Sequence, residues 1–325
     1  MRNGYTTGAT ACAAAVASCV FKLSNRIIET ADILLPNGTP AHIPVHRDID
    51  FFYGVKDGGD DVDVTHGMRI YADCVLNDTG DIEVTGGQGI GIVTKKGLQV
   101  PVGRYAINPA PEKMIKENLK RLLGDRGAKV TIWAPDGERI AKETFNEKVG
   151  VVGGISIIGT TGIVTPMSVE AIIETIKCET DVAAAEQKET ICLTPGKIGE
   201  KHFLKKYPHI SVILMSNFAH EAFDYASKKG FNRLYVAGHP AKLCKILMGY
   251  YNTHSKNSPM ATDWLADRLE LKEKFNTVEE ILTSVDIDLS FLAGELAEKI
   301  EKDYGFAHVS VIFYDMNGGE KGARL

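Results

Sequence analysis

The chain has 325 residues, of which 44% are hydrophobic and 24% are charged. Since a typical domain has about 150 residues, this length predicts two domains, and the composition excludes disordered, fibrous and membrane-embedded classes. With 37 Lys and Arg against 42 Asp and Glu, the formal net charge is -5, so the chain as a whole attracts neither nucleic acid nor an anionic membrane surface. We therefore expect no nucleic-acid partner and no membrane partner.

The six cysteines form no C-x-x-C pair, which argues against a structural zinc site. Free thiols inside apolar runs pack as small hydrophobic groups and favour a reducing compartment. Four cysteines lie in or beside such runs, namely Cys12, Cys19, Cys178 and Cys192. The N-terminus lacks a basic region followed by a long apolar stretch, and no segment reaches the roughly 20 apolar residues of a membrane span. We therefore expect a cytoplasmic protein.

In the first part of the chain, an Ala-rich segment at 6–24 predicts a helix. It is followed by short runs typical of strands, punctuated by glycine turns that favour antiparallel hairpins, at 31–36, 42–45, 68–76, 81–84 and 91–94. An amphipathic helix at 112–123 and a strand at 129–133 come next. Together these elements predict an α+β domain over residues 1–147.

From residue 148 to 325, short apolar runs alternate with helix-length segments, which is typical of a parallel sheet with crossover helices. We expect strands at 149–158, 190–194, 211–215, 234–237 and 309–314. We expect helices at 168–185, 202–207, 220–229, 242–251, 277–284 and 290–303. This second domain is predicted to be α/β and Rossmann-like, with a mainly parallel, doubly wound sheet.

Glycines and small polar residues follow the expected strands of this sheet, where doubly wound proteins bind their ligands. We predict that they bind a cofactor. They are Gly159, Thr160, Thr161, Gly162, Thr194, Gly196, Ser216, Asn217, Gly238 and His239. For a histidine at a loop end, a hydrogen-bonded structural role is the alternative.

A tight glycine turn opens the first helix, formed by Gly4, Tyr5, Thr6, Thr7 and Gly8. Unpaired backbone N–H groups at such a helix start suit a carboxylate or a phosphate. A glycine turn with a threonine cap explains the same pattern without a ligand. Both interpretations stay open on the sequence alone.

The segment 56–67 packs four aspartates, one lysine and one histidine into twelve positions beside two adjacent glycines. Its spacing does not match a calcium loop. Asp60, Asp61 and His66 are candidates for proton transfer or for hydrogen bonds to a polar substrate. A solvated hairpin connection is the alternative.

Other common motifs are absent or mismatched. Residues 86–91 contain several glycines, but their spacing differs from the dinucleotide fingerprint and strand signals follow them. The sequence contains no Walker A motif, no G-x-S-x-G and no H-E-x-x-H. These observations argue against a nicotinamide site at 86–91, a Walker-type nucleotide hydrolase and the commonest hydrolases.

Six stretches that occur in order resemble one family, the cobalt-precorrin-5B carbon-1 methyltransferases (CbiD) of the anaerobic cobalamin pathway. They lie at 4–8, 56–67, 87–91, 106–109, 154–164 and 253–255. The chain departs from the family pattern after His239, where it has Pro240 and Ala241, and at 257–259.

The resemblance implies methylation of carbon 1 of cobalt-precorrin-5B by S-adenosylmethionine to give cobalt-precorrin-6A. It implies a two-domain fold unlike that of other tetrapyrrole methyltransferases, and a cobalt ion that arrives within the substrate instead of a protein-bound metal. The expected partner is the small-molecule corrinoid, with other enzymes of the pathway as candidate partners. We make no prediction about the oligomeric state.

Methyl transfer from a sulfonium is an in-line displacement, so the protein needs to orient donor and acceptor and needs no covalent nucleophile. His66 or a neighbouring aspartate would support loss of a ring proton. The acidic arms of the corrinoid need basic groups and N–H donors. We therefore expect substrate contacts at Gly4, Tyr5, Thr6, Thr7, Gly8, Lys56, Asp57, Arg104 and His254. The alternatives are a small-molecule kinase that holds ATP phosphates at the glycine turn, and a non-enzymatic corrinoid carrier.

Overall fold

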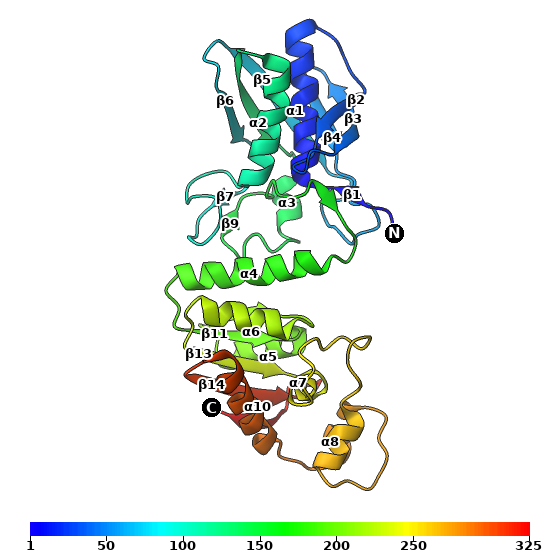
Figure 1. Cartoon of the computed structure of the whole chain (residues 1–325), viewed down its shortest axis with the longest axis vertical. Coiled ribbons are helices and arrows are strands. Elements are labelled where there is room, and N and C mark those ends of the chain that lie inside the picture. The colour runs from blue at the N-terminus through cyan, green and yellow to red at the C-terminus, as the bar shows by residue number, and fades with distance from the viewer. The chain divides into compact units, whose positions relative to one another are not determined.

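The computed structural model describes residues 1–325 and divides into two compact units, unit 1 (Met1–Ser168) and unit 2 (Val169–Leu325). Figure 1 shows the elements of both units along the chain. The boundary lies at Ser168 and not at the expected residue 147, because the segment between them pairs with the start of the chain. Strand β10 (Ile163–Val164) is antiparallel to β1 (Gly4–Tyr5), which ties this segment into unit 1.

Unit 1 contains a six-stranded sheet in the order β2-β3-β4-β5-β8-β6. Its strands are β2 (Thr30–Leu34), β3 (Pro40–Asp48), β4 (Phe51–Val55), β5 (Arg69–Asn77), β8 (Gly127–Trp133) and β6 (Ile82–Gly86). The helices are α1 (Thr7–Ser24), α2 (Pro109–Leu123) and α3 (Gly137–Ala141). The expected antiparallel hairpins are present in β2 to β5, whereas β6 runs parallel to β8. Strand β4 and helix α3 were not predicted.

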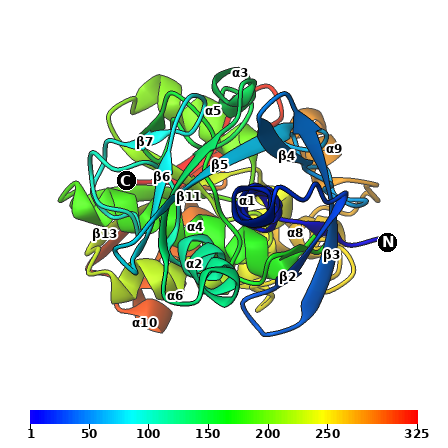
Figure 2. The ribbon, with the colours of Figure 1, turned by 90° about the horizontal axis from the view of Figure 1, so that it is seen from above.

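Helix α1 forms the centre of unit 1, packed between the sheet and α2, and Figure 2 shows it end-on. Its residues from Thr7 to Val20 are all buried, because their small side chains let the helix lie close to the sheet. The helix starts at the Thr6 cap and ends at Asn25 in a left-handed conformation. By length and composition alone α1 could cross a membrane, but 78% of it is buried inside unit 1, as expected of a core helix.

The expected strand at 149–158 is wrong. Only β9 (Val151–Val152) is a strand, and it pairs with β7 (Ile92–Val93) of unit 1. Gly154 interrupts the run, because its backbone lies so close to Gly89 that a Cβ would be 2.2 Å from the Gly89 carbonyl oxygen. The apolar residues that follow fill the core of unit 1 and do not open the sheet of unit 2.

Unit 2 contains a five-stranded sheet in the order β12-β11-β13-β14-β15. Its strands are β12 (Ser211–Leu214), β11 (Thr190–Thr194), β13 (Arg233–Gly238), β14 (His308–Tyr314) and β15 (Glu320–Arg324). The first four are parallel and β15 is antiparallel, so the mixed α/β character is confirmed. The order of the strands along the chain reverses between β11 and β13.

Helices cover both faces of this sheet. Phe203 of α5 (Lys197–Lys206) packs on one face, and the other face carries most of the remaining helices. These are α4 (Val169–Ala185), α6 (Ala219–Lys228), α7 (Pro240–Leu247), α8 (Thr262–Arg268), α9 (Val278–Ser284) and α10 (Ser290–Tyr304). Helix α8 and strand β15 were not predicted.

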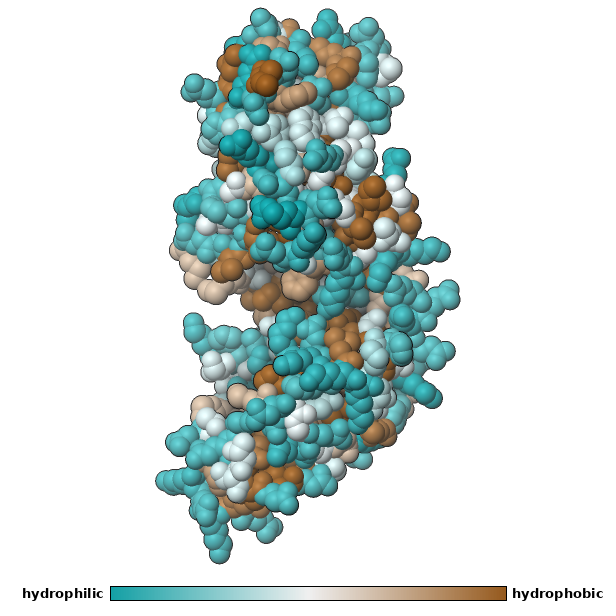
Figure 3. All heavy atoms as spheres, turned by 180° about the vertical axis from the view of Figure 1, so that it is seen from behind, coloured by the Kyte–Doolittle hydropathy of each residue, from teal (hydrophilic) through white to brown (hydrophobic).

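The surface and the cysteines agree with the composition. Figure 3 shows a largely hydrophilic face on which hydrophobic areas are separated by polar residues. All six cysteines are free thiols, and five of them are buried, with Cys178 half-buried. Burial raises the pKa of Cys244 to about 12, so this thiol packs as an apolar group.

Candidate functional site

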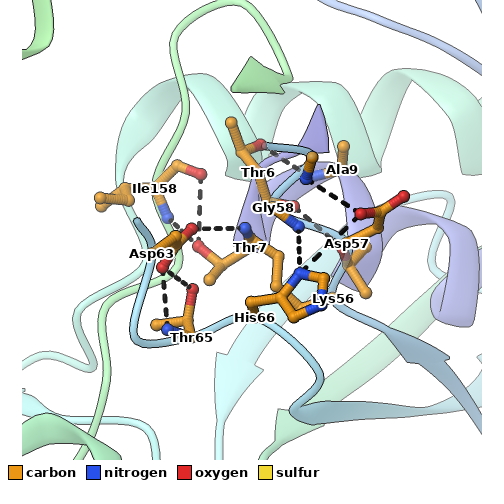
Figure 4. Close-up of polar contacts among 12 residues, drawn as sticks. Thr6, Thr7, Ala9, Lys56, Asp57, Gly58, Asp63, Thr65, His66 and Ile158 are labelled. Atoms are coloured by element: carbon orange, nitrogen blue, oxygen red, sulfur yellow. Dashed lines mark hydrogen bonds and ion pairs between the residues drawn. The ribbon is translucent and has the colours of Figure 1, made fainter. Parts of the chain in front are cut away.

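The segment Lys56–Gly67, here named the acidic loop, joins β4 to β5 and is held by a buried ion pair (Figure 4). Lys56 is 1% exposed and its Nζ lies 2.6 Å from Oδ2 of Asp63. Burial acts to raise the pKa of Asp63, but hydrogen bonds from Lys56 and Thr65 hold that pKa below its ordinary value. Lys56 is therefore already paired with Asp63 inside the loop. The structure contradicts the expectation that Lys56 binds a substrate carboxylate.

Three further aspartates of the acidic loop have partners in the protein. Arg2 forms a double contact with Asp57 and lowers the pKa of Asp57 to about 2. Asp60 accepts a hydrogen bond from the Arg2 backbone N–H (2.5 Å), and Asp61 accepts one from the Met167 N–H (3.1 Å). The aspartates therefore fasten the loop to the first residues and the last residues of unit 1. Asp57 is engaged by Arg2 and is not free to bind the corrinoid.

His66 is an exposed titratable group of the acidic loop. Its Nδ1 accepts a hydrogen bond from the Gly58 N–H at 3.0 Å, so the neutral ring carries its proton on Nε2. The side chain is 55% exposed, and Nε2 has no partner in the protein. As it stands, His66 therefore offers an N–H donor. To act as a base, the ring must break its bond to Gly58.

The start of helix α1 is closed by the chain itself. The N–H groups of Tyr5, Thr6 and Gly8 donate to carbonyl oxygens of unit 1 at 2.7 to 3.0 Å, and Thr6 Oγ1 accepts from the Ala9 N–H. Thr7 Oγ1 accepts from the Ile158 N–H at 2.9 Å, as Figure 4 shows. These bonds use most of the donors that an anionic ligand would need, and only the Thr7 N–H has no acceptor. The structure therefore supports the interpretation without a ligand for the turn Gly4–Gly8.

Gly159, Thr160, Thr161 and Gly162 also lie in unit 1, and they do not follow a strand of the unit 2 sheet as expected. Gly159 has φ +130°, and a Cβ on it would lie 2.3 Å from Oγ1 of Thr6. Gly162 has φ +81° and accepts the Thr6 N–H. These glycines thus allow the segment to pack on the start of α1.

In unit 2, helix α5 begins at the carboxyl end of β11 without a side-chain cap. The N–H groups of Lys197, Ile198 and Gly199 have no acceptor in the protein, and the space beside Gly196 is open. Gly199 lets the helix start against β13, since a Cβ there would lie 2.2 Å from the Ala237 carbonyl oxygen. Thr194 precedes this loop and is fully buried, so it supports the loop by packing and is not exposed to a ligand.

At the end of β12, Ser216 has φ +53°, a left-handed conformation that turns the chain sharply. Asn217 accepts two hydrogen bonds from Thr253, one at its carbonyl oxygen (3.0 Å) and one at Oδ1 (3.2 Å). Its Nδ2 has no partner in the protein. His254 is exposed, and its Nδ1 accepts the Lys256 N–H at 3.1 Å, which leaves an N–H donor on Nε2.

At the end of β13, His239 is fully used by the protein. Its Nδ1 accepts the Ala241 N–H at 3.1 Å and its Nε2 lies 2.8 Å from Glu279. The structural alternative therefore applies to His239, which caps α7. Gly238 is needed because a Cβ there would lie 2.8 Å from Cδ of Pro195. Glu279 lies 40 positions away along the chain, and no local signal identified it.

Two basic side chains remain to be placed. Arg104 lies in the exposed loop between β7 and α2, and only its backbone makes hydrogen bonds. Its guanidinium is free to bind a carboxylate, although no hydrogen bond joins it to the acidic loop. Lys242 of α7 donates to the Pro195 carbonyl at 3.1 Å, and burial together with Lys245 lowers the pKa of Lys242. No cluster of three or more His, Cys, Asp or Glu side chains that would suit a metal ion is present.

In α/β proteins, small ligands bind at the carboxyl ends of parallel strands. The ends of β11, β12 and β13 form this arrangement, so unit 2 belongs to the α/β class of folds. The CbiD family profile matches residues 1–166. The chain is 40% identical, over 95% of its length and 82% of theirs, to proteins named cobalt-precorrin-5B C(1)-methyltransferase from Salmonella arizonae and Salmonella typhimurium. This chain belongs to the CbiD family, which confirms the resemblance seen in the sequence.

The chain is also similar to a solved structure, that of the cobalamin biosynthesis protein CbiD from Archaeoglobus fulgidus, at 29% sequence identity. The alignment covers 83% of this chain and 85% of that one, with a TM-score of 0.44.

Proposed function

We propose that this protein transfers a methyl group from S-adenosylmethionine to carbon 1 of cobalt-precorrin-5B and so forms cobalt-precorrin-6A. The observation that carries this function is the 40% identity to named cobalt-precorrin-5B C(1)-methyltransferases across 95% of the chain. The protein is thus a C-methyltransferase of cobalamin biosynthesis. The kinase alternative is not favoured, because most backbone donors at the start of α1, on which it relied, are occupied.

The methyl donor is proposed to bind at the strand ends of unit 2. The free N–H groups at the start of α5 and the helix dipole suit the carboxylate of the methionine part of the donor. Open space beside Gly196 lets the ligand approach the backbone, and the Nδ2 of Asn217 offers a donor at the neighbouring strand. Ser216 and Gly238 are the other proposed contacts of this site. The buried Thr194 and the helix cap His239 are proposed to support the loops without contacting the methyl donor.

In unit 1, the corrinoid is proposed to bind to His66 and to the unpaired guanidinium of Arg104. His66 presents an N–H donor, and Arg104 suits a carboxylate arm of the substrate. The expected substrate contact at His254 stays a prediction. Asp60 and Asp61 orient the acidic loop through their backbone contacts, and no covalent nucleophile is required. A cytoplasmic location and contacts with other enzymes of the pathway stay predictions.

The test of the function is direct. The purified protein is incubated with S-adenosylmethionine and cobalt-precorrin-5B, and the corrinoid product is weighed by mass spectrometry. We expect one added methyl group, and loss of the signal when the methyl donor is omitted. Corrinoid binding without any added methyl would identify a carrier and contradict the proposal. Binding of ATP in place of S-adenosylmethionine would favour the kinase alternative.

A further inference from the structure

Lys245 of α7 is a buried lysine without a carboxylate partner. The residue is 7% exposed, and its Nζ donates to the carbonyl oxygen of Thr253 and to Oγ of Ser258, each at 3.1 Å. Burial lowers the pKa of Lys245, and no ion pair offsets the cost of the buried charge. The ammonium is therefore held by these two oxygens alone, although it has three N–H donors.

The two oxygens belong to one turn, residues 252–258. Ser258 Oγ donates in turn to the His254 carbonyl oxygen at 3.0 Å, and the Ser258 N–H donates to the same oxygen at 3.0 Å. The turn is thus closed on itself by His254 and fastened to α7 near both ends by Lys245. Removing the ammonium leaves Thr253 without its anchor to the helix.

Thr253 passes this constraint to the strand end of β12. Its N–H donates to the Asn217 carbonyl oxygen and its Oγ1 donates to Asn217 Oδ1. Because Oδ1 accepts, the orientation of the amide is set, and the N–H donors of Nδ2 are left for a ligand. One chain of hydrogen bonds therefore runs from Lys245 through Thr253 to Asn217.

We propose that Lys245 is a positioning residue that fixes the Asn217 amide toward the methyl donor. The same contacts hold His254 in its turn, with its Nε2 donor exposed. This inference rests on the proposed site for S-adenosylmethionine at the strand ends of unit 2. It assigns Lys245 no contact with the ligand, so its effect is exerted through Thr253.

The first test measures the turn itself by amide hydrogen exchange in the full-length protein without any ligand. In K245M, a side chain of similar length that lacks the ammonium, we expect the Thr253 amide to exchange at least tenfold faster. Helix α6 should keep its protection. The control is K206M, since Lys206 of α5 is paired with Glu320 at 3.1 Å and does not bind the turn. Unchanged protection of Thr253 in K245M overturns the inference, whatever the protein binds.

The second test measures S-adenosylmethionine affinity by calorimetry in a double-mutant cycle. We expect K245M and N217A each to weaken binding by about fivefold to tenfold, the effect of one hydrogen bond. The double variant K245M/N217A should bind within twofold of N217A, because both changes remove the same contact. Effects that multiply, or a K245M variant with the affinity of the wild type, would overturn the proposal.

A second pair of variants covers the case in which K245M does not fold. T253V keeps the carbonyl oxygen that Lys245 binds but removes the hydroxyl that holds Asn217, whereas T253S keeps the hydroxyl. We expect weaker binding only in T253V. If the wild-type protein binds S-adenosylmethionine and the N217A variant binds it with the same affinity, the inference is overturned but the proposed cofactor site stands. Wild-type protein that does not bind it overturns both.

Discussion

At the scale of single residues, His66 is defined by what each ring nitrogen does. Nδ1 is occupied by the Gly58 N–H, and Nε2 is exposed with its proton. A neutral hydrogen bond to substrate contributes about 0.5–1.5 kcal/mol, which corresponds to a factor of about two to ten in rate. A general base would contribute about 10²-fold to 10⁴-fold. The size of the loss on substitution therefore separates the two roles.

We expect H66A to lower the single-turnover rate by a factor of about two to ten and to leave S-adenosylmethionine affinity intact, since the structure gives His66 a donor role. H66Q keeps an N–H donor and should recover part of the rate. Rates are to be measured with both substrates saturating. A loss of a thousandfold or more would assign His66 as the base. A full rate in H66A would make the acidic loop purely structural.

Asp57 should make unfolding of unit 1 sensitive to acid. Its folded pKa is about 2, below the ordinary value of 3.8, because Arg2 hydrogen-bonds the charged form. A lowered folded pKa stabilises the fold above pH 4, and that stability is lost as the pH falls from about 4 to 2. The pair is partly exposed, so we expect D57N to cost at most about 1 kcal/mol at pH 6. Urea unfolding at pH 6 and pH 3 checks this. D57N should lose less stability on acidification than the wild type.

At the scale of elements, the start of α5 depends on two glycines with different surroundings. Gly196 has extended backbone and open space beside it, whereas a Cβ on Gly199 would lie 2.2 Å from the Ala237 carbonyl oxygen of β13. The first position is free for a ligand. The second is closed by packing. Substitutions at the two sites should therefore fail in different ways.

We expect G196V to weaken S-adenosylmethionine binding at least tenfold while thermal unfolding stays unchanged, because the added side chain occupies only the ligand's space. G199A should instead destabilise the protein by about 1–3 kcal/mol, the usual cost of overpacking. Calorimetric binding and thermal unfolding of both variants provide the check. Unchanged affinity in a folded G196V protein would place the methyl donor elsewhere.

The elements show which parts of the fold follow from local sequence. Helix α1 was predicted from its alanine content and α2 from its apolar spacing, because neither signal depends on distant contacts. Strand β4 was missed because Gly54 weakens its strand signal. That glycine is required by tertiary packing, since a Cβ there would lie 2.7 Å from Cγ2 of Thr10.

The candidate site likewise contains residues that the local sequence located and residues that it did not. Gly196, Ser216 and Asn217 lie two or three residues after the end of a strand, so the pattern of strands located them. Glu279 and Lys245 act on residues that are distant in sequence or in a separate turn, and no local pattern marks such contacts. Lys56 was misassigned because a sequence shows a charge but not its burial or its partner. Long-range pairing therefore decides which polar residues of this chain remain free for a ligand.

At the scale of the whole molecule, the last prediction concerns the boundary between the two units. Residues 148–168 complete unit 1. Ile155 and Ile157 are 1% and 0% exposed, and β10 pairs with β1. Each buried isoleucine contributes about 1.5–3 kcal/mol. Together with the lost pairing and the hydrogen bonds to the start of α1, this is a large part of the roughly 5–15 kcal/mol that stabilises a domain.

We therefore expect a fragment of residues 1–168 to fold and a fragment of residues 1–147 to lack a cooperative unfolding transition, because the shorter one exposes the core around α1. Circular dichroism during thermal unfolding of the two fragments provides the measurement. The full-length double variant Ile155→Ala with Ile157→Ala is the matched control, since it removes the two side chains but keeps the pairing of β10. It should fold with reduced stability. Cooperative unfolding of the 1–147 fragment would restore the boundary at residue 147 and would make the segment 148–168 an addition to a domain that is already complete.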